Sequence, residues 1–338
     1  MAPRIEIVGA GVAGLCAATL FAERGCAVTV RAAGEGPDRH GCSWWAGGML
    51  APWCELESAP PAILTLGLES MAFWKSRTGL VTERGSLVIA GARDLPDLRQ
   101  FASRTHGFSE LDRAGVDELE PALEGRFERA LHFADECHLD PRDALRALVD
   151  ALRERAGVDL QLSRALRSRE LSRPPDADWR IDCRGLAARD TLAGLRGVRG
   201  EMLLLHAPGL GLTRPIRLLH PRYPLYVVPR ANEVYMVGAT MIESDDRGHV
   251  SARSLMELLS AAYALHPRFG EAGVLEIGVD ARPAYPDNVP RLTRRGRTLF
   301  VNGLYRHGFL AAPAIARRAV ELALDNVIDE EFTDEDHP

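Results

Sequence analysis

The chain has 338 residues, 46% of them hydrophobic, and its 41 Lys and Arg against 47 Asp and Glu give a formal net charge of −6. This length and apolar content predict a large buried core, divided between two domains. The negative charge offers no general attraction to nucleic acid or to an anionic membrane, and no apolar run approaches the ~20 residues of a transmembrane helix. The first residues lead directly into a strand pattern without a signal-peptide layout, so we expect a cytoplasmic protein.

The six cysteines show neither a C-x-x-C pair nor the spacing of a zinc site. They are Cys16, Cys26, Cys42, Cys54, Cys137 and Cys183. We therefore expect six reduced thiols, as in most cytoplasmic proteins, and no bound metal.

The strongest motif lies near the N-terminus and follows a strand–turn–helix–strand pattern. Ile5–Val8 is a short apolar run with β-branched residues, and it leads into Gly9–Gly14, a complete G-x-G-x-x-G. Leu15–Arg24 then has a helical pattern that Gly25 ends, and Ala27–Val30 is typical of a second strand. Because the motif joins a strand to a helix, it predicts a dinucleotide-binding βαβ unit rather than a purely structural glycine turn.

Each glycine of this motif has a separate physical task. Gly9 permits the tight turn, Gly11 lets the backbone approach a pyrophosphate, and Gly14 lets the helix pack closely on the strand. The N-terminus of the helix that follows then offers free N–H groups and a partial positive charge to the phosphates.

One position departs from the usual pattern. An acidic residue normally ends the second strand and binds the ribose hydroxyls, but this chain has Arg31 followed by Ala32, and the nearest acid is Glu35. One interpretation is that another group or a water binds the ribose. The alternative is that Arg31 faces the 2′-phosphate of NADP, and the residues themselves leave both open.

The segment Cys42–Pro52 combines two tryptophans with a run of small residues. Trp44 and Trp45 do not suit a surface helix, and the segment is either buried packing or a wall for a planar ligand. At Gly47 and Gly48 the missing side chains would allow backbone to lie against such a ligand.

The middle of the chain predicts alternating helices and strands. Asp140 and Pro141 begin one helix clearly, because Asp suits the N-cap and Pro the first helical position. The expected elements are helix 60–78, a strand pair within 82–90, a short helix 112–123, strands 130–133 and 137–139, helix 141–155, and strands 159–166 and 179–183.

From Gly200 onward the pattern becomes rich in strands before it returns to alternation. The expected elements are strands 201–206, 225–229 and 234–238, helix 252–265, strands 274–279 and 298–302, a loop 303–308, and helix 310–326. The acidic tail 325–338 is expected to fray.

These elements predict an α/β protein with two domains. A Rossmann-like, discontinuous nucleotide-binding domain is expected from 1–80, 140–200 and 283–338. The remaining residues, 81–139 and 201–282, are expected to form a β-rich (α+β) substrate-binding domain.

Several stretches occur in the order found in one enzyme family. They are the G-x-G-x-x-G of Gly9–Gly14, Ala46–Pro52, Tyr226–Arg230, Gly238–Met241, Arg282–Pro283 and Gly303–Pro313. Together they resemble glycine oxidases of the thiamine-pathway (ThiO) type, within the D-amino acid oxidase and sarcosine oxidase superfamily of FAD enzymes. The resemblance extends from residue 4 to about 325.

The resemblance implies non-covalently bound FAD and oxidation of a small amino acid or amine, such as glycine, sarcosine or a small D-amino acid. Hydride transfer to the flavin would yield the imine, and reoxidation by O2 would yield H2O2, in connection with thiamine thiazole biosynthesis. A homo-oligomer is compatible with this family. Alternatives are an amine dehydrogenase that passes electrons to another carrier, a flavin-binding subunit without its own chemistry, and the NADP hypothesis.

The resemblance also implies roles for residues around the substrate. Arg282 would clamp the substrate carboxylate in a bidentate manner, Tyr226 would donate its hydroxyl to the same group, and Met241 would line the pocket. Arg306 would reach either the carboxylate or the flavin edge, and His307 would add a polar contact. Taken alone, such residues also serve as surface charges or core packing, so these roles depend on the family pattern.

A larger set is implied for the cofactor. In the resemblance, Cys42 and Ser43 meet the phosphates or the ribityl chain, the next stretch passes the isoalloxazine ring, Leu166 offers backbone to the adenine, and the start of the last helix faces the flavin N1/O2 edge. The full set is Gly9, Gly11, Val12, Ala13, Gly14, Arg31, Cys42, Ser43, Ala46, Gly47, Gly48, Met49, Leu166, Gly185, Leu304, Tyr305, Arg306, His307, Gly308, Phe309 and Leu310.

Overall fold

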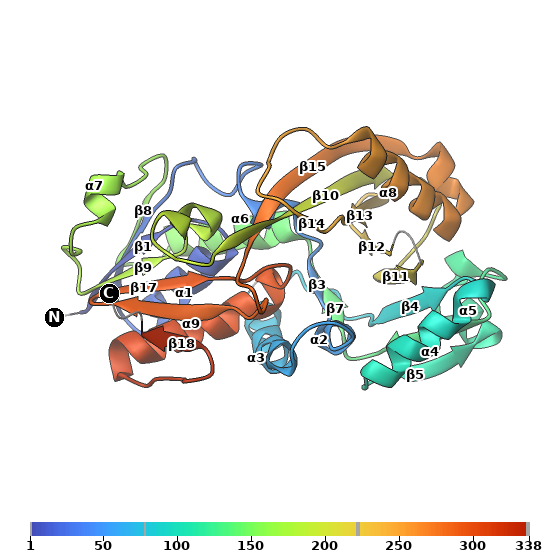
Figure 1. The fold of residues 1–338 in the computed structure, drawn as a ribbon, viewed down its shortest axis with the longest axis horizontal. Coiled ribbons are helices and arrows are strands. Elements are labelled where there is room, and N and C mark those ends of the chain that lie inside the picture. The colour runs from blue at the N-terminus through green and yellow to red at the C-terminus, as the bar shows by residue number, and fades with distance from the viewer. Residues whose placement is uncertain (1, 78, 221–223, 336–338) are drawn as a thin grey trace.

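The computed structural model describes residues 2–77, 79–220 and 224–335, which build two large sheets with helices packed on them (Figure 1). The first sheet and its helices occupy one half of the molecule, and the second sheet occupies the other half. The long antiparallel strands β10 and β15 extend along the second sheet toward the first, with β10 beginning and β15 ending near the first sheet (Figure 1).

The first sheet has seven strands in the order β18-β16-β17-β9-β1-β2-β8. Its central strands are parallel, and β16 runs antiparallel to β17. The strands are β18 (Thr333–Glu335), β16 (Arg291–Arg295), β17 (Thr298–Asn302), β9 (Trp179–Asp182), β1 (Arg4–Val8), β2 (Ala27–Arg31) and β8 (Val158–Gln161). Parallel pairing of β1 with β2 through a helix is the arrangement that the opening motif predicts.

Four helices share a hydrophobic core with this sheet: α1 (Val12–Glu23), α3 (Pro61–Arg77), α6 (Pro141–Arg153) and α9 (Gly308–Asp325). Helix α1 is buried on nearly every side, which its small residues permit. Helix α6 instead has one apolar stripe, and the Asp140 carboxylate accepts a hydrogen bond from the Arg142 N–H at 2.8 Å, as its N-cap predicts.

The second sheet is mixed, with the order β14-β10-β13-β12-β11-β4-β6-β5 and with β15 paired to β10. Helix α4 packs on its β4–β6 portion, and α5 and α8 belong to a second core that also contains residues of β4, β6 and β10–β13. The elements are β4 (Ser86–Ala90), α4 (Leu95–Arg104), β5 (Ser109–Asp112), α5 (Arg113–Leu119), β6 (Arg129–Phe133), β10 (Arg196–His206), β11 (Ile216–Leu219), β12 (Leu225–Pro229), β13 (Val234–Gly238), β14 (Ile242–Glu243), α8 (Ala252–Leu265) and β15 (Gly273–Ala284).

Short elements lie between the two sheets (Figure 1). Strands β3 (Met49–Leu50) and β7 (Cys137–His138) form a two-stranded ladder, and α2 (Pro52–Glu55) follows β3 directly. A 3-10 turn, Cys42–Trp45, precedes them, while the short helix α7 (Ser168–Leu171) lies outside this region.

The opening unit and most later elements are confirmed, with corrections at several places. The strand expected over 159–166 ends at Gln161, because Ser163 adopts a left-handed φ of 60°. The strand pair expected within 82–90 is the single strand β4, with only an isolated bridge at Thr82. The tail does not fray throughout, since β18 pairs with β16. Thr78, the last residue of an expected helix, lies outside the described residues.

Some elements carried no clear sequence signal, namely α4, β5, β11 and β16, and β15 is twice as long as the expected strand 274–279. Among the described residues, no helix has the length and apolar character needed to cross a membrane.

Candidate active site

A cavity of about 780 Å³ begins at the N-terminus of α1 and reaches the junction of the two sheets. It is within the size range of small-molecule and cofactor sites. Every residue that the sequence predicted for the cofactor or substrate lines this cavity, except Gly14. Gly14 instead packs against the turn itself, because a Cβ there would lie 1.9 Å from the Gly9 carbonyl oxygen.

The glycine turn is built as its motif requires. Gly9 has φ +110°, and its N–H donates a hydrogen bond to the Arg31 carbonyl at 2.8 Å. Gly11 is the N-cap of α1, and no side chain of its own caps the helix. The Val12 N–H instead donates to Ser43 Oγ at 3.1 Å. The turn therefore presents free N–H groups beside a hydroxyl, a surface that fits a pyrophosphate.

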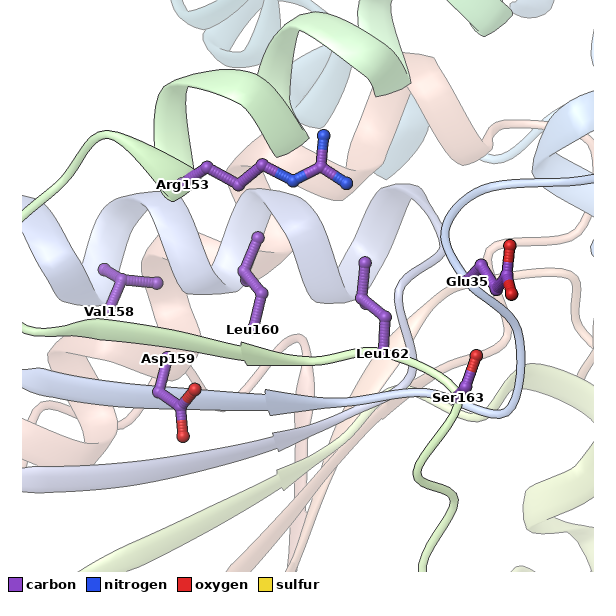
Figure 2. A pocket seen from close by; sticks show the side chains of 7 residues that line it. All are labelled: Glu35, Arg153, Val158, Asp159, Leu160, Leu162 and Ser163. Carbon is purple, nitrogen blue, oxygen red and sulfur yellow. The ribbon is translucent and has the colours of Figure 1, made fainter.

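Arg31 and Glu35, the charged residues nearest the position of the missing acid, have different surroundings. The Arg31 guanidinium donates to Glu6 Oε1 at 2.9 Å and to the side-chain oxygen of Gln161, and Glu6 also pairs with Arg180 at 2.7 Å. Glu35 lines a separate cavity of about 410 Å³, beneath the end of α6 and beside β8 (Figure 2). Arg31 thus lines the large cavity with its charge already paired, and Glu35 lies outside it.

The tryptophan-glycine segment forms one wall of the cavity and also packs against the protein. The Arg142 guanidinium stacks over Trp44 at 4.5 Å, and the Trp45 ring fills the space that a side chain at Gly278 would need. A Cβ at Gly47 would lie 2.9 Å from the Tyr226 ring. The tryptophans therefore pack internally while the backbone lines the cavity, and contact of that backbone with a planar ligand stays a prediction.

Arg282 projects from β15 across the neighbouring strand β10. Its guanidinium lies over Gly200, where a Cβ would come within 2.0 Å of Nη2, and Nη1 donates to the Thr240 carbonyl at 3.2 Å. Tyr226 enters the same cavity from β12. Arg282 therefore lines the same cavity as Tyr226 rather than facing bulk water.

The loop before α9 contributes a second arginine. Arg306 Nη2 lies 2.8 Å from Glu55 Oε2 and donates to Ser58 Oγ at 2.7 Å, while Nη1 lies 3.5 Å from the sulfur of Met241. Helix α9 begins at Gly308, two residues earlier than expected, and its N-terminus lines the cavity. Met241 is 53% exposed, which places it at the mouth of the cavity.

Glu55 and Arg217 are site residues that the sequence analysis missed. Arg217 on β11 is paired across the strands with Tyr226, and its Nη2 donates to Glu55 Oε1 at 2.7 Å. Burial acts to raise the pKa of Glu55, but Arg306 and Arg217 outweigh it and hold that pKa well below its usual range. The one available signal was a lone arginine in the apolar run Ile216–Leu219.

Burial keeps His307 neutral, since it lowers the pKa of the imidazole to about 4 despite the nearby Glu55. A second buried carboxyl, Glu136, lies behind this cluster. It accepts a hydrogen bond from the Cys54 N–H at 2.8 Å and another from the Ser86 hydroxyl. Burial raises the pKa of Glu136 to about 7. Over 2–77, 79–220 and 224–335, His, Cys, Asp and Glu form no group suited to a metal ion.

A parallel sheet with a glycine turn opening onto a long cavity defines a dinucleotide-binding enzyme, and the cavity's lining fits FAD. The chain belongs to the FAD dependent oxidoreductase family (DAO), whose model matches residues 4–322. It is accordingly an FAD-dependent oxidoreductase.

Individual relatives narrow the resemblance. The chain is 54% identical to a Rhizobium etli protein named as a thiamine biosynthesis oxidoreductase, ThiO, over 93% of this chain and 94% of the relative. It is 24% identical to the glycine oxidase of Pseudomonas aeruginosa over 95% of each chain. Its fold matches the crystal structure of glycine oxidase from Geobacillus kaustophilus with a TM-score of 0.81 at 23% identity, covering 97% of this chain and 96% of that one.

Proposed function

We propose that the protein oxidises a small amino acid or amine, such as glycine, sarcosine or a small D-amino acid, by hydride transfer to FAD. In this proposal the parts 1–80, 140–200 and 283–338 hold the cofactor, and 81–139 with 201–282 hold the substrate. The observation that carries it is that Arg282 and Tyr226 line one cavity together with the glycine turn.

Arg282 is suited to hold the substrate carboxylate. A guanidinium presents paired N–H donors that match the two oxygens of a carboxylate, and a phenol hydroxyl adds a third donor. The Thr240 carbonyl holds Arg282 Nη1, which fixes the direction of the guanidinium. Anchoring the carboxylate leaves the amine and the Cα–H to be oriented by the walls of the cavity, and such orientation lowers the barrier without a general base.

FAD supplies the hydride acceptor in this reaction. The N-terminus of α9 lines the cavity. In this proposal its N–H groups would stabilise negative charge on the bound ring. Arg306 adds a positive charge there, partly balanced by Glu55.

Two further parts of the proposal rest on the relatives. The similarity to ThiO and to glycine oxidases supports O2 as the electron acceptor, H2O2 as a product and a link to thiamine thiazole biosynthesis. The six unpaired cysteines support a cytoplasmic location.

The test begins with protein reconstituted with FAD and mixed anaerobically with glycine, sarcosine and D-alanine. Bleaching of the flavin by at least one of them is expected, and an oxidised spectrum with every member would overturn the proposal. Arg282→Met should lower kcat/KM at least 100-fold, whereas Arg253→Met, at an arginine whose side chain is 74% exposed, should leave it unchanged. Unchanged turnover in Arg282→Met would remove the clamp.

The electron acceptor needs a separate measurement. Peroxide should form with a yield near one per substrate oxidised in air. Rapid anaerobic reduction of an artificial acceptor with little peroxide in air would instead identify a dehydrogenase.

A further inference from the structure

Position 32 lacks the group that normally holds the adenosine ribose of the dinucleotide. In this fold an acid at the end of the second strand accepts hydrogen bonds from the ribose hydroxyls. Here β2 ends at Arg31, and the next residue is the buried Ala32, whose side chain can accept no hydrogen bond. A ribose diol bound at this point needs an acceptor from elsewhere in the chain.

The neighbouring charged groups do not supply it. The Arg31 guanidinium offers only donors, which already bind Glu6 and Gln161. The two oxygens of Glu6 pair with Arg31 and Arg180. Glu35 lines the smaller cavity and lies beside Ser163 (Figure 2).

The loop after β2 places the Asp38 carboxylate close to the position of the missing acid. It lines the large cavity together with Gly34, Gly36 and Leu166, the residue expected near the adenine. Its Oδ2 lies 2.9 Å from where a Cβ on Gly34 would be, so the carboxylate folds back over a residue only two positions after Ala32.

The Asp38 carboxylate is fixed in orientation through one oxygen, while the other oxygen can still accept a hydrogen bond. Asp38 Oδ1 accepts a hydrogen bond from the His40 N–H at 2.8 Å, which fixes its orientation. Within the described part of the chain no cation forms an ion pair with Asp38, so Oδ2 remains available as an acceptor. The loop itself is anchored, because the Ser163 N–H donates to the Gly34 carbonyl at 2.8 Å.

We propose that Asp38 replaces the acid missing at position 32 and accepts hydrogen bonds from the 2′- and 3′-hydroxyls of the adenosine ribose of FAD. Gly34 is part of this arrangement, since a side chain there would displace the carboxylate. The proposal concerns cofactor binding and is independent of which amine the enzyme oxidises.

The experiment measures the Kd of FAD for the apoprotein by quenching of flavin fluorescence. Asp38→Asn and Asp38→Ala should raise the Kd roughly 10-fold or more, as expected for loss of a charge-assisted hydrogen bond. Glu35→Gln, three residues away in the same loop, should change it less than about twofold. Equal effects of Glu35→Gln and Asp38→Asn, or no effect of either Asp38 variant, would overturn the proposal.

Two further measurements distinguish the loss of a ribose contact from a structural change in the loop. Adding Ala32→Glu to Asp38→Ala should restore most of the affinity, because it returns the acid to its usual place. The wild-type protein should bind an FAD analogue that lacks the adenosine 2′-hydroxyl more weakly than it binds FAD. Asp38→Ala should bind the analogue and FAD with nearly equal affinity, because its ribose contact is already lost. An equal loss in both proteins would assign the hydroxyl to another residue and overturn the proposal.

Discussion

Arg217 and Glu55 join the second sheet to the segment that lines the large cavity, with 2.7 Å between Arg217 Nη2 and Glu55 Oε1. Arg217 belongs to β11, while Glu55 ends the short helix α2 between the two sheets. Their side chains are only 15% and 12% exposed, so water screens the pair weakly. Glu55 also contacts Arg306, and it therefore positions two arginines of the site.

Glu55→Gln should destabilise the protein substantially. It leaves Arg217 and Arg306 without a carboxylate in a mostly buried place, and breaking a buried pair in this way costs about 3 kcal/mol. The free energy of unfolding in urea, measured on the FAD-loaded protein, tests this expectation.

Glu57→Gln is the matched control, because Glu57 is two residues away and pairs with Arg104 at 3.2 Å near the surface. An exposed pair of this kind contributes at most about 1 kcal/mol. Similar losses in Glu55→Gln and Glu57→Gln would contradict the special position of Glu55.

Gly200→Ala should impair substrate binding with little loss of stability. The new methyl group would overlap the Arg282 guanidinium, which is the mobile end of a long side chain and can move aside. Its displacement removes the proposed carboxylate clamp, so KM for the amine should rise at least 10-fold while the Kd of FAD stays within about twofold.

Gly273→Ala, on the strand next to β10, is the control for that variant, since a methyl group added there would have no other atom within 4 Å. It should leave KM unchanged. A normal KM in Gly200→Ala would show that the guanidinium position observed over Gly200 is not the one used for substrate.

Glu136→Gln should change how stability depends on pH. Folding raises the pKa of this carboxyl from 4.5 to about 7, so between these values the folded protein keeps a proton that the unfolded chain releases. Protonated Glu136 therefore adds to the unfolding free energy of the wild type at low pH, and this addition falls as the pH rises from about 4.5 to 7 and is absent above 7. The amide in Glu136→Gln cannot ionise, so the variant's unfolding free energy does not fall in this way.

The unfolding free energy of Glu136→Gln minus that of the wild type should thus increase by roughly 1–3 kcal/mol when the pH is raised from 5 to 8. Urea titrations of both proteins at the two pH values measure the difference, with exposed Glu118→Gln as a control. A mutant-to-wild-type difference that is identical at both values would refute a buried, proton-binding Glu136.

Gly14→Ala should weaken FAD binding more than any exposed glycine change. Its methyl group would lie 1.9 Å from the Gly9 carbonyl oxygen, and backbone cannot move aside as a side chain does. We expect the Kd of FAD to rise at least 10-fold, with the same Gly273→Ala variant retaining normal affinity. Full affinity for FAD in Gly14→Ala would contradict this prediction, because it would mean that the glycine turn can widen without losing the cofactor.

Features that depend on neighbouring residues could be predicted from the amino-acid sequence. The glycine turn after β1, the Asp140 cap of α6 and the span of α8 all follow from backbone geometry, capping or periodicity within a few residues. These local signals were enough to predict the nucleotide-binding unit. The resemblance to a known family was needed to predict Arg282 and Tyr226 as site residues.

Which distant charges meet became apparent only in the folded chain. Glu55 and Arg217 are 162 residues apart, and nothing in either local pattern records that two sheets pack so as to bring them together. Arg31 likewise has the charge of an NADP-binding residue in the sequence, and the neighbouring strands supply Glu6 and Gln161 as its partners. Electrostatic pairing depends on separation in space, and that separation exists only once the sheets and the segment between them have packed.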